Sequence, residues 1–104
     1  MSENENMVGV VGAGAWGTAL AEVMAAASGQ SLIWAREAEV VNAINDAHEN
    51  TVYLAGNKLS PNVKATGELN DLARCKALLL VTPAQHLRTT LAALPDTNAP
   101  LLLC

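Results

Sequence analysis

The chain carries three glycines in the spacing G-x-G-x-x-G, directly after a short apolar run. The apolar run is Val8–Val11, and the glycine segment is Gly12–Gly17. Residues Thr18–Ala27 follow; they are rich in alanine, leucine and methionine, with neither proline nor glycine before Gly29. This order predicts a strand, a tight turn and a helix. It is the opening of a βαβ unit, in which the next strand lies parallel to the first.

Each glycine of this segment has its own physical task. Gly12 permits the tight turn, Gly14 lets the main chain approach a ligand without a Cβ, and Gly17 allows close packing of helix on strand. The helix that begins here presents unpaired N–H groups and the positive end of its dipole, which favour a bound anion. The segment therefore predicts a pyrophosphate site of a dinucleotide, with a plain glycine-rich turn as the alternative. The predicted site residues are Gly12, Ala13, Gly14, Ala15, Trp16 and Gly17.

Length and composition favour a single α/β domain. The chain has 104 residues, enough for one domain, and 51% of them are hydrophobic, which suits a buried parallel sheet. The net charge of -4 and the lack of a Lys/Arg cluster argue against nucleic acid as a partner. No apolar run approaches the roughly 18 residues that cross a membrane, and the polar start at residues 1–6 resembles no signal peptide. Cys75 and Cys104 lack metal-ligand spacing, so we expect free thiols in a reducing cytoplasm and no metal site.

Strands and helices are predicted to alternate along the rest of the chain. Further strands are expected at residues 31–35, 62–66, 77–81 and 100–104, the last two as buried apolar strands. Further helices are expected at residues 37–45, from 66 or 67 to 73, and from 83 to 94, with a long polar connection over 46–61. This alternation predicts an α/β fold of the Rossmann type, doubly wound around a mostly parallel sheet.

Arg36 lies where such a fold selects its cofactor. It follows the second predicted strand, 22 positions after Gly14, where the sheet meets the adenosine ribose. An acid at this place binds a ribose 2′-hydroxyl, whereas an arginine binds a 2′-phosphate and can stack on adenine. The neighbouring Glu37 could accept a hydroxyl or weaken phosphate binding. We expect NADP to be favoured and NAD tolerated. One charge-assisted hydrogen bond from Arg36 could shift the relative affinity roughly ten- to hundredfold. The alternative is a surface arginine at a strand end without a role in binding.

Five other residues have weaker interpretations. Trp16 could shield a cofactor from water or fasten the helix to the sheet. Pro83 follows a predicted parallel strand at the edge where open α/β sheets bind ligands, so it is a candidate neighbour of the nicotinamide half, or it simply begins a helix. Trp34, in an apolar strand, is expected in the core. His48 and His86 have no Asp, Ser or Cys partner at a telling spacing and are expected at the surface or in helix packing, so no catalytic residue is predicted.

The glycine segment belongs to a longer stretch, Val10–Ala21, with the sequence VVGAGAWGTALA. This stretch closely resembles the opening of bacterial NAD(P)-dependent glycerol-3-phosphate dehydrogenases, and it is much narrower than a general dinucleotide motif. Three later segments resemble that family in order and spacing, so the resemblance covers essentially the whole chain. They are Leu32–Arg36, His48–Asn50 leading to Tyr53–Leu54, and Val81–Ala84.

By resemblance, Ala15, Trp16 and Arg36 fall at positions that contact the dinucleotide in that family. The family usually has a serine where Ala15 stands, so a hydroxyl to the phosphates is lost here and the backbone N–H is left. A proline is frequent where Ala55 stands, and its loss affects the stiffness of a loop. Tyr53 could lean over the cofactor.

The resemblance implies a cytoplasmic oxidoreductase that transfers hydride between NAD(P)H and dihydroxyacetone phosphate, giving sn-glycerol 3-phosphate for phospholipid synthesis. It allows a homodimer of the full-length enzyme. In that family a Lys-Gly segment and a helical C-terminal domain follow and carry the catalytic and substrate-binding lysines. We therefore expect residues 1–104 to form an incomplete NAD(P)-binding Rossmann domain that is inactive alone. Its apolar end, Leu101–Cys104, is expected to favour self-association.

Two other interpretations stay open. The chain could be a stand-alone module that binds a dinucleotide without chemistry, or the cofactor domain of a reductase with another 2-keto substrate. A reading frame that continues past Cys104 with Lys-Gly and a helical domain would favour the dehydrogenase.

Overall fold

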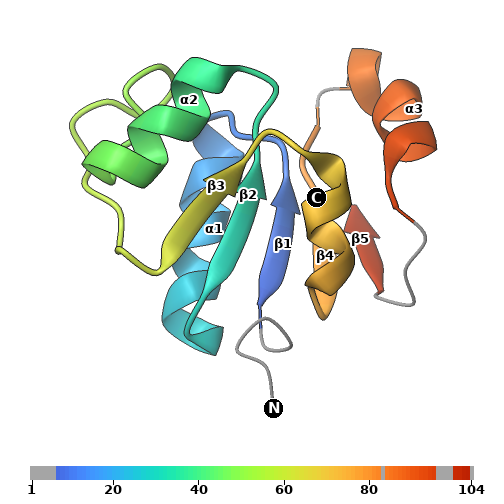
Figure 1. The fold of residues 1–104 in the computed structure, drawn as a ribbon, viewed down its shortest axis with the longest axis horizontal. Helices are drawn as coiled ribbons and strands as arrows, with labels where there is room; N and C mark the ends of the chain where they lie inside the picture. Colours follow the sequence, from blue (N-terminus) through green and yellow to red (C-terminus); the bar gives the residue numbers. More distant parts are fainter. Residues whose placement is uncertain (1–6, 83, 96–99, 104) are drawn as a thin grey trace.

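One five-stranded parallel sheet, covered by helices on both faces, forms the fold (Figure 1). The computed structural model describes residues 7–82, 84–95 and 100–103. The strands are β1 (Val8–Val11), β2 (Ser31–Trp34), β3 (Val63–Thr66), β4 (Ala77–Leu80) and β5 (Leu101–Leu103). Their order across the sheet is β3-β2-β1-β4-β5, so the chain moves outward from β1 to β3 and then returns to the other side of β1. This is the doubly wound α/β arrangement that the sequence predicts.

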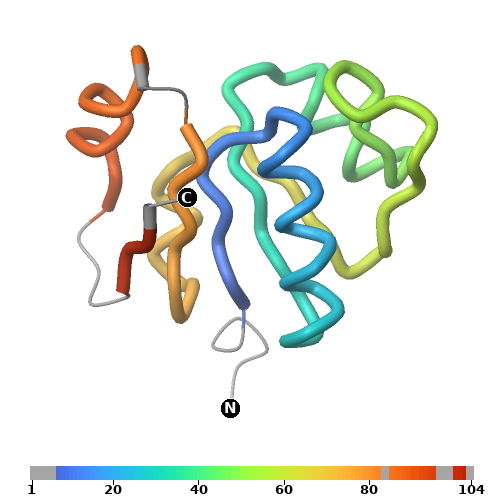
Figure 2. Tube along the Cα trace, turned by 180° about the vertical axis from the view of Figure 1, so that it is seen from behind, coloured from blue at the N-terminus to red at the C-terminus, as the bar shows by residue number. Residues whose placement is uncertain are grey.

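Helices connect the strands and occupy opposite faces of the sheet. They are α1 (Ala15–Ser28), α2 (Ala38–Asn42), α3 (Ala84–Ala93), the π-helix η2 (Ala43–Ala47) that continues α2, and the 3₁₀-helix η3 (Leu69–Arg74). Helix α1 lies behind the sheet in Figure 1 and in front of it in Figure 2, whereas η3 lies on the other face. Within the described residues, no helix is long and apolar enough to cross a membrane.

Alternate side chains of the strands build two separate apolar layers. Val10 and Ile33 point to the face covered by α1, where Ala21 and Ala25 pack against them. Val11, Leu32, Trp34, Leu78 and Leu80 point to the opposite face, where Leu72 of η3 completes the cluster. The continuous apolar runs of β1 and β4 are therefore buried on both faces, as predicted for strands inside a parallel sheet.

The predicted helix over residues 37–45 forms, but it widens after Asn42 into the π-helix η2. The wider turn places the Asn45 side chain beside the edge strand β3. There the Asn45 amide nitrogen donates to the Ala65 carbonyl and its oxygen accepts from the Ala65 N–H, both at 2.9 Å. Asn45 thus satisfies backbone groups that an edge strand leaves unpaired. Helix η2 ends at His48, which is half-buried and has a positive φ of 54°.

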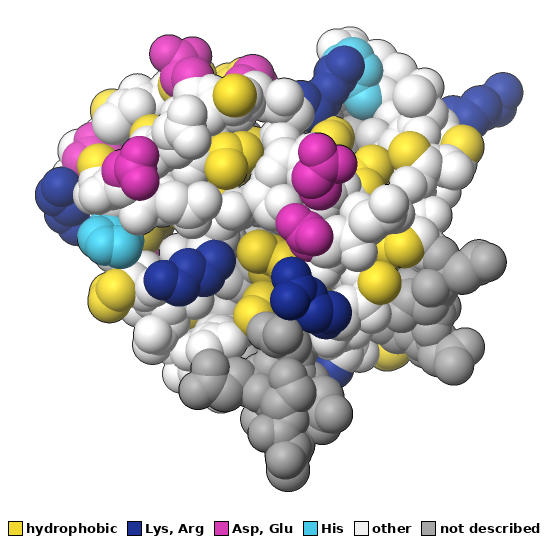
Figure 3. Space-filling model, in the orientation of Figure 1, with side chains coloured by type: hydrophobic (Ala, Val, Ile, Leu, Met, Phe, Trp, Pro, Cys, Tyr) yellow, Lys and Arg dark blue, Asp and Glu magenta, His cyan; other side chains and the backbone are white. Residues whose placement is uncertain are grey.

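The sequence predicts a buried strand at residues 100–104. A strand forms there, but the prediction that it is buried is wrong. Strand β5 forms at Leu101–Leu103, but Leu101 is 43% exposed and Leu102 is 54% exposed. The reason is its place in the sheet, because β5 pairs with β4 on one side and no other strand of the described residues pairs with it on the other. Hydrophobic side chains are visible at the surface over this part of the molecule (Figure 3). Cys104 lies outside the described residues.

The chain around Gly9 leaves no room for a larger side chain. A Cβ on Gly9 would lie 2.6 Å from Leu78 Cδ2, 3.0 Å from the Cys75 sulfur and 3.1 Å from Leu72 Cδ2. Cys75 is a buried free thiol, as predicted, and burial raises its pKa to about 11. The packing here is therefore tight, apolar and uncharged at neutral pH.

Gly9→Ala is expected to lower the free energy of unfolding by about 1–3 kcal/mol, since overpacked cores must shift side chains or backbone. Urea denaturation followed by circular dichroism measures the change. Gly67→Ala is the matched control, because a Cβ there would meet its nearest neighbour, the Ala35 oxygen, at an ordinary 3.9 Å. Equal stability of the two variants would show that the layer under β1 accommodates a methyl group.

Candidate functional site

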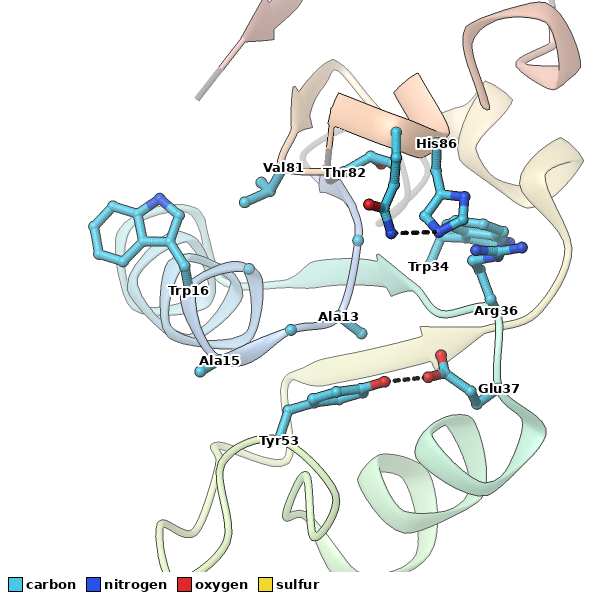
Figure 4. Close-up of a pocket in the computed structure, with 14 residues that line it drawn as sticks. Ala13, Ala15, Trp16, Trp34, Arg36, Glu37, Tyr53, Val81, Thr82 and His86 are labelled. Carbon is cyan, nitrogen blue, oxygen red and sulfur yellow. Dashed lines mark hydrogen bonds between the residues drawn. The ribbon is translucent and has the colours of Figure 1, made fainter. Parts of the chain in front are cut away.

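A cavity of about 420 Å³ opens at the carboxyl ends of β1, β2 and β4 (Figure 4). The strand order reverses between β1 and β4, and open α/β sheets bind their ligands at such a point. Four parts of the chain line the cavity. They are the turn Gly12, Ala13, Gly14, Ala15, Trp16 and Gly17; the residues Trp34, Arg36 and Glu37 at the end of β2; Tyr53; and Val81, Thr82, Gln85 and His86 after β4.

The glycine turn has the geometry that its spacing predicts. Gly12 has a φ of 122°, and a Cβ there would lie 3.0 Å from the Val81 oxygen, so only glycine fits. A Cβ on Gly17 would clash with the Gly12 oxygen, which shows how closely α1 approaches the turn. Gly14 is different, because no described atom lies within 4 Å of the place where its Cβ would be. Gly14 is exposed and is one of the residues that line the cavity.

The N-terminus of α1 opens into this space. Its N-cap is Gly14, no side chain of the described residues caps it, and its first turn is uncharged. The first N–H groups of a helix have no intrahelical partner, and the helix dipole places positive potential around them. Helix α1 has 14 residues, and its N-terminus lines the cavity. Such a helix end is suited to hold an anion such as a phosphate.

Trp16 projects from this turn and is 63% exposed. Such exposure rules out the interpretation that its ring fastens α1 to the sheet. The ring lies at the edge of the cavity (Figure 4), which leaves the shielding of a ligand as the prediction for this residue.

Arg36 supplies positive charge at the other end of the cavity. It is exposed and lies just after β2. Within the described residues the ion pairs are Lys58–Glu49 and Arg74–Asp71, so no carboxylate there pairs with the Arg36 guanidinium.

Trp34, close to Arg36 in Figure 4, is 9% exposed, and its Nε1 donates to the Gly67 oxygen at 3.1 Å. It therefore lies in the core as predicted, and it also lines the cavity, which its apolar strand does not indicate.

Glu37 also lines the cavity, and in Figure 4 it lies below Arg36 with its carboxylate toward Tyr53. The Tyr53 hydroxyl donates a hydrogen bond to the Glu37 carboxylate. This hydrogen bond and the negative charge of Glu37 raise the pKa of Tyr53 above its usual value. The carboxylate next to Arg36 is thus engaged by a neutral phenol. Because Tyr53 comes from the long connection after η2, no periodicity in the sequence places it here.

The segment after β4 completes the cavity. Val81 and Thr82 lie at its edge, and the Thr82 hydroxyl donates to the Val11 oxygen at 3.0 Å. His86 lies beside Arg36 in Figure 4, with its Nε2 at 3.4 Å from Gln85 Nε2. The sequence predicts His86 at the surface or in helix packing, not at the cavity. A usable signal is position, since His86 lies in the first turn of the helix that follows β4. Pro83, the other predicted residue, lies outside the described residues.

Comparisons with known proteins agree with this geometry. Residues 7–101 match the family described as NAD-dependent glycerol-3-phosphate dehydrogenase N-terminus. The proteins named glycerol-3-phosphate dehydrogenase [NAD(P)+] from Caulobacter vibrioides and Erythrobacter litoralis are 54% and 50% identical to this chain. Each alignment covers 93% of this chain, but 30% and 29% of the relative.

Solved structures give the same result. The glycerol-3-phosphate dehydrogenases from Plasmodium falciparum and Coxiella burnetii superpose with TM-scores of 0.85 and 0.80, both at 26% identity. The superpositions cover 95% and 96% of this chain and 32% of each of those chains. The chain thus spans about a third of the length of the proteins it matches, and it belongs to the family of NAD-dependent glycerol-3-phosphate dehydrogenases, in the part that forms their N-terminus.

Proposed function

We propose that the cavity binds a nicotinamide dinucleotide, NADP in preference to NAD, for a glycerol-3-phosphate dehydrogenase. One observation carries this proposal: the N-terminus of α1 and Arg36 line the same cavity, and among the described residues no side chain caps that N-terminus and no carboxylate pairs with Arg36. The pyrophosphate would lie against the turn from Gly12 to Gly17, where the backbone N–H groups of Ala15 and Trp16 belong to the first helical turn. The membership in an NAD(P)-dependent family supports the same ligand.

The proposed preference for NADP rests on two charged residues, Arg36 and Glu37, where the adenosine end is proposed to bind. Arg36 offers a guanidinium that can fork onto a 2′-phosphate and stack on adenine. Glu37 would repel that phosphate, but its carboxylate already accepts the Tyr53 hydroxyl. The positive charge of Arg36 therefore acts with less opposition than the sequence Arg36-Glu37 alone suggests.

The reacting end of the dinucleotide is proposed to lie at the carboxyl edge of β4, beside Val81 and Thr82, and Pro83, the next residue in the sequence, stays a candidate neighbour. When bound, the nicotinamide would supply the hydride exchanged between dihydroxyacetone phosphate and sn-glycerol 3-phosphate. We assign no catalytic residue to this chain. The groups that protonate the carbonyl oxygen and hold the substrate phosphate are proposed to lie in the part of the relatives that this chain does not span.

Titration of the 104-residue chain with NADPH and NADH, followed by cofactor fluorescence, tests the proposal. We expect both to bind, NADPH more tightly, and the amide signals of Gly12–Gly17 in nuclear magnetic resonance spectra to shift. Reduced nicotinamide mononucleotide, which lacks the adenosine, is expected to bind much more weakly. Oxidation of NADPH with dihydroxyacetone phosphate is expected to stay at background for this chain. Absence of binding at millimolar concentration, or shifts located elsewhere, would contradict the proposal.

A further inference from the structure

Asn50 is a fully buried polar residue that joins two walls of the cavity without lining it. Its side-chain nitrogen donates to the Ala13 carbonyl oxygen and to the Thr18 hydroxyl oxygen, each at 2.8 Å. Its side-chain oxygen accepts the Tyr53 N–H at 3.1 Å. A buried amide must satisfy its donors and acceptor, and Asn50 does so by connecting the glycine turn, α1 and the connection that carries Tyr53.

The connection that carries Asn50 is itself held at its base. We name residues 49–58 the Tyr53 loop. An antiparallel bridge joins Glu49 to Lys58, and the Leu59 N–H donates to the His48 oxygen at 2.6 Å. The Glu49 carboxylate also accepts the Gly56 N–H at 2.9 Å. The Asn50 side chain therefore projects from a closed loop, which makes it a fixed point for the turn opposite.

The bond to Ala13 decides where the next N–H points. A trans peptide is planar, so its C=O and N–H point in opposite directions. Because Asn50 holds the Ala13 carbonyl toward the protein interior, the N–H of Gly14 in the same peptide plane is directed away from Asn50, and Gly14 itself is exposed and lines the cavity. The described residues supply no hydrogen-bond acceptor for this N–H.

We propose that Asn50 is a positioning residue, which aims the Gly14 N–H at the pyrophosphate and couples the Tyr53 loop to the glycine turn. The proposal rests on the proposed binding of a dinucleotide. Asn50 would touch no ligand atom; it acts through the Ala13–Gly14 peptide. Figure 4 shows Ala13 and Tyr53, the two positions that Asn50 joins across the cavity wall.

Asn50→Asp is the sharpest test, because it keeps the oxygen that accepts the Tyr53 N–H and removes both donors. We expect NADPH to bind roughly tenfold more weakly, the loss of about one charge-assisted hydrogen bond. Adenosine 2′-monophosphate has no 5′-phosphate. Its dissociation constant for Asn50→Asp is expected to lie within about twofold of its dissociation constant for the unmodified chain. In the ligand-free protein the amide signal of Gly14 is expected to move, since its peptide is no longer held.

Asn45→Asp is the matched control. It makes the same chemical change at a residue that also bonds to backbone, at Ala65, but outside the cavity. It is expected to lower stability without changing the NADPH affinity. If Asn50→Asp does not fold, Thr18→Val removes one of the two Asn50 acceptors and should weaken NADPH in the same selective way.

Equal losses for NADPH and adenosine 2′-monophosphate would reduce Asn50 to a structural residue, and unchanged NADPH affinity in Asn50→Asp would overturn the proposal. If the unmodified chain binds no dinucleotide, the proposed function fails. The Gly14 amide signal of the ligand-free unmodified chain can still be compared with that of ligand-free Asn50→Asp. If the signal does not move, Asn50 does not hold the Ala13–Gly14 peptide.

Discussion

Replacing Gly14 by valine is expected to weaken NADPH binding by at least about a hundredfold, the equivalent of one to two charge-assisted hydrogen bonds, while the fold survives. The backbone of Gly14 has a φ of -69° and a ψ of -175°, which any residue adopts. A Cβ there meets no described atom within 4 Å. The protein therefore tolerates the new side chain, but the two γ-methyl groups fill the space in which the phosphates are proposed to approach the main chain.

Isothermal titration with NADPH and urea denaturation separate the two effects for Gly14→Val. A loss of about 1 kcal/mol in stability is expected, because valine is a poor N-cap residue. Gly14→Ala adds one carbon and is expected to give an intermediate affinity. Undiminished binding by Gly14→Val would place the pyrophosphate away from this turn.

The sheet could be predicted from the sequence because its strands are short apolar runs. Val8–Val11 and Ala77–Leu80 are buried on both faces, so every position in them is apolar or small, and glycine or proline lies near their ends. The exposure of Leu101 and Leu102 could not be predicted in the same way. An apolar run shows that a strand forms, but its place at the centre or the edge of the sheet depends on the strand order.

The glycine turn and Arg36 could also be located from the sequence, because both lie next to strand ends whose place in a doubly wound sheet follows a general rule. Asn50 could not, and Tyr53 is suggested only by the resemblance to the dehydrogenase family. They lie in a long connection without periodicity, and their positions depend on hydrogen bonds to residues 16 and 37 positions away in the sequence. For the same reason, the charge of Glu37 can be read from the sequence, but its hydrogen bond with the Tyr53 hydroxyl cannot.

Arg36→Ala is expected to weaken NADPH by roughly ten- to a hundredfold, the loss of a charge-assisted hydrogen bond of about 1.5–3 kcal/mol, and to change NADH affinity much less. The 2′-phosphate is the difference between the two cofactors, and Arg36 is an exposed cation in the part of the cavity lining where the adenosine end is proposed to bind. Dissociation constants of both cofactors for both proteins give the ratio that decides this prediction.

The controls for Arg36 separate its charge from its shape and its place. Arg74→Ala removes an exposed arginine from η3, outside the cavity, and should leave both dissociation constants unchanged. Arg36→Lys keeps the charge but loses the planar fork, so part of the preference for NADPH should remain. Tyr53→Phe frees the Glu37 carboxylate and should lower NADPH affinity while sparing NADH. An unchanged NADPH to NADH ratio in Arg36→Ala would mean that this guanidinium does not meet the 2′-phosphate, and the cofactor preference would then have to come from elsewhere.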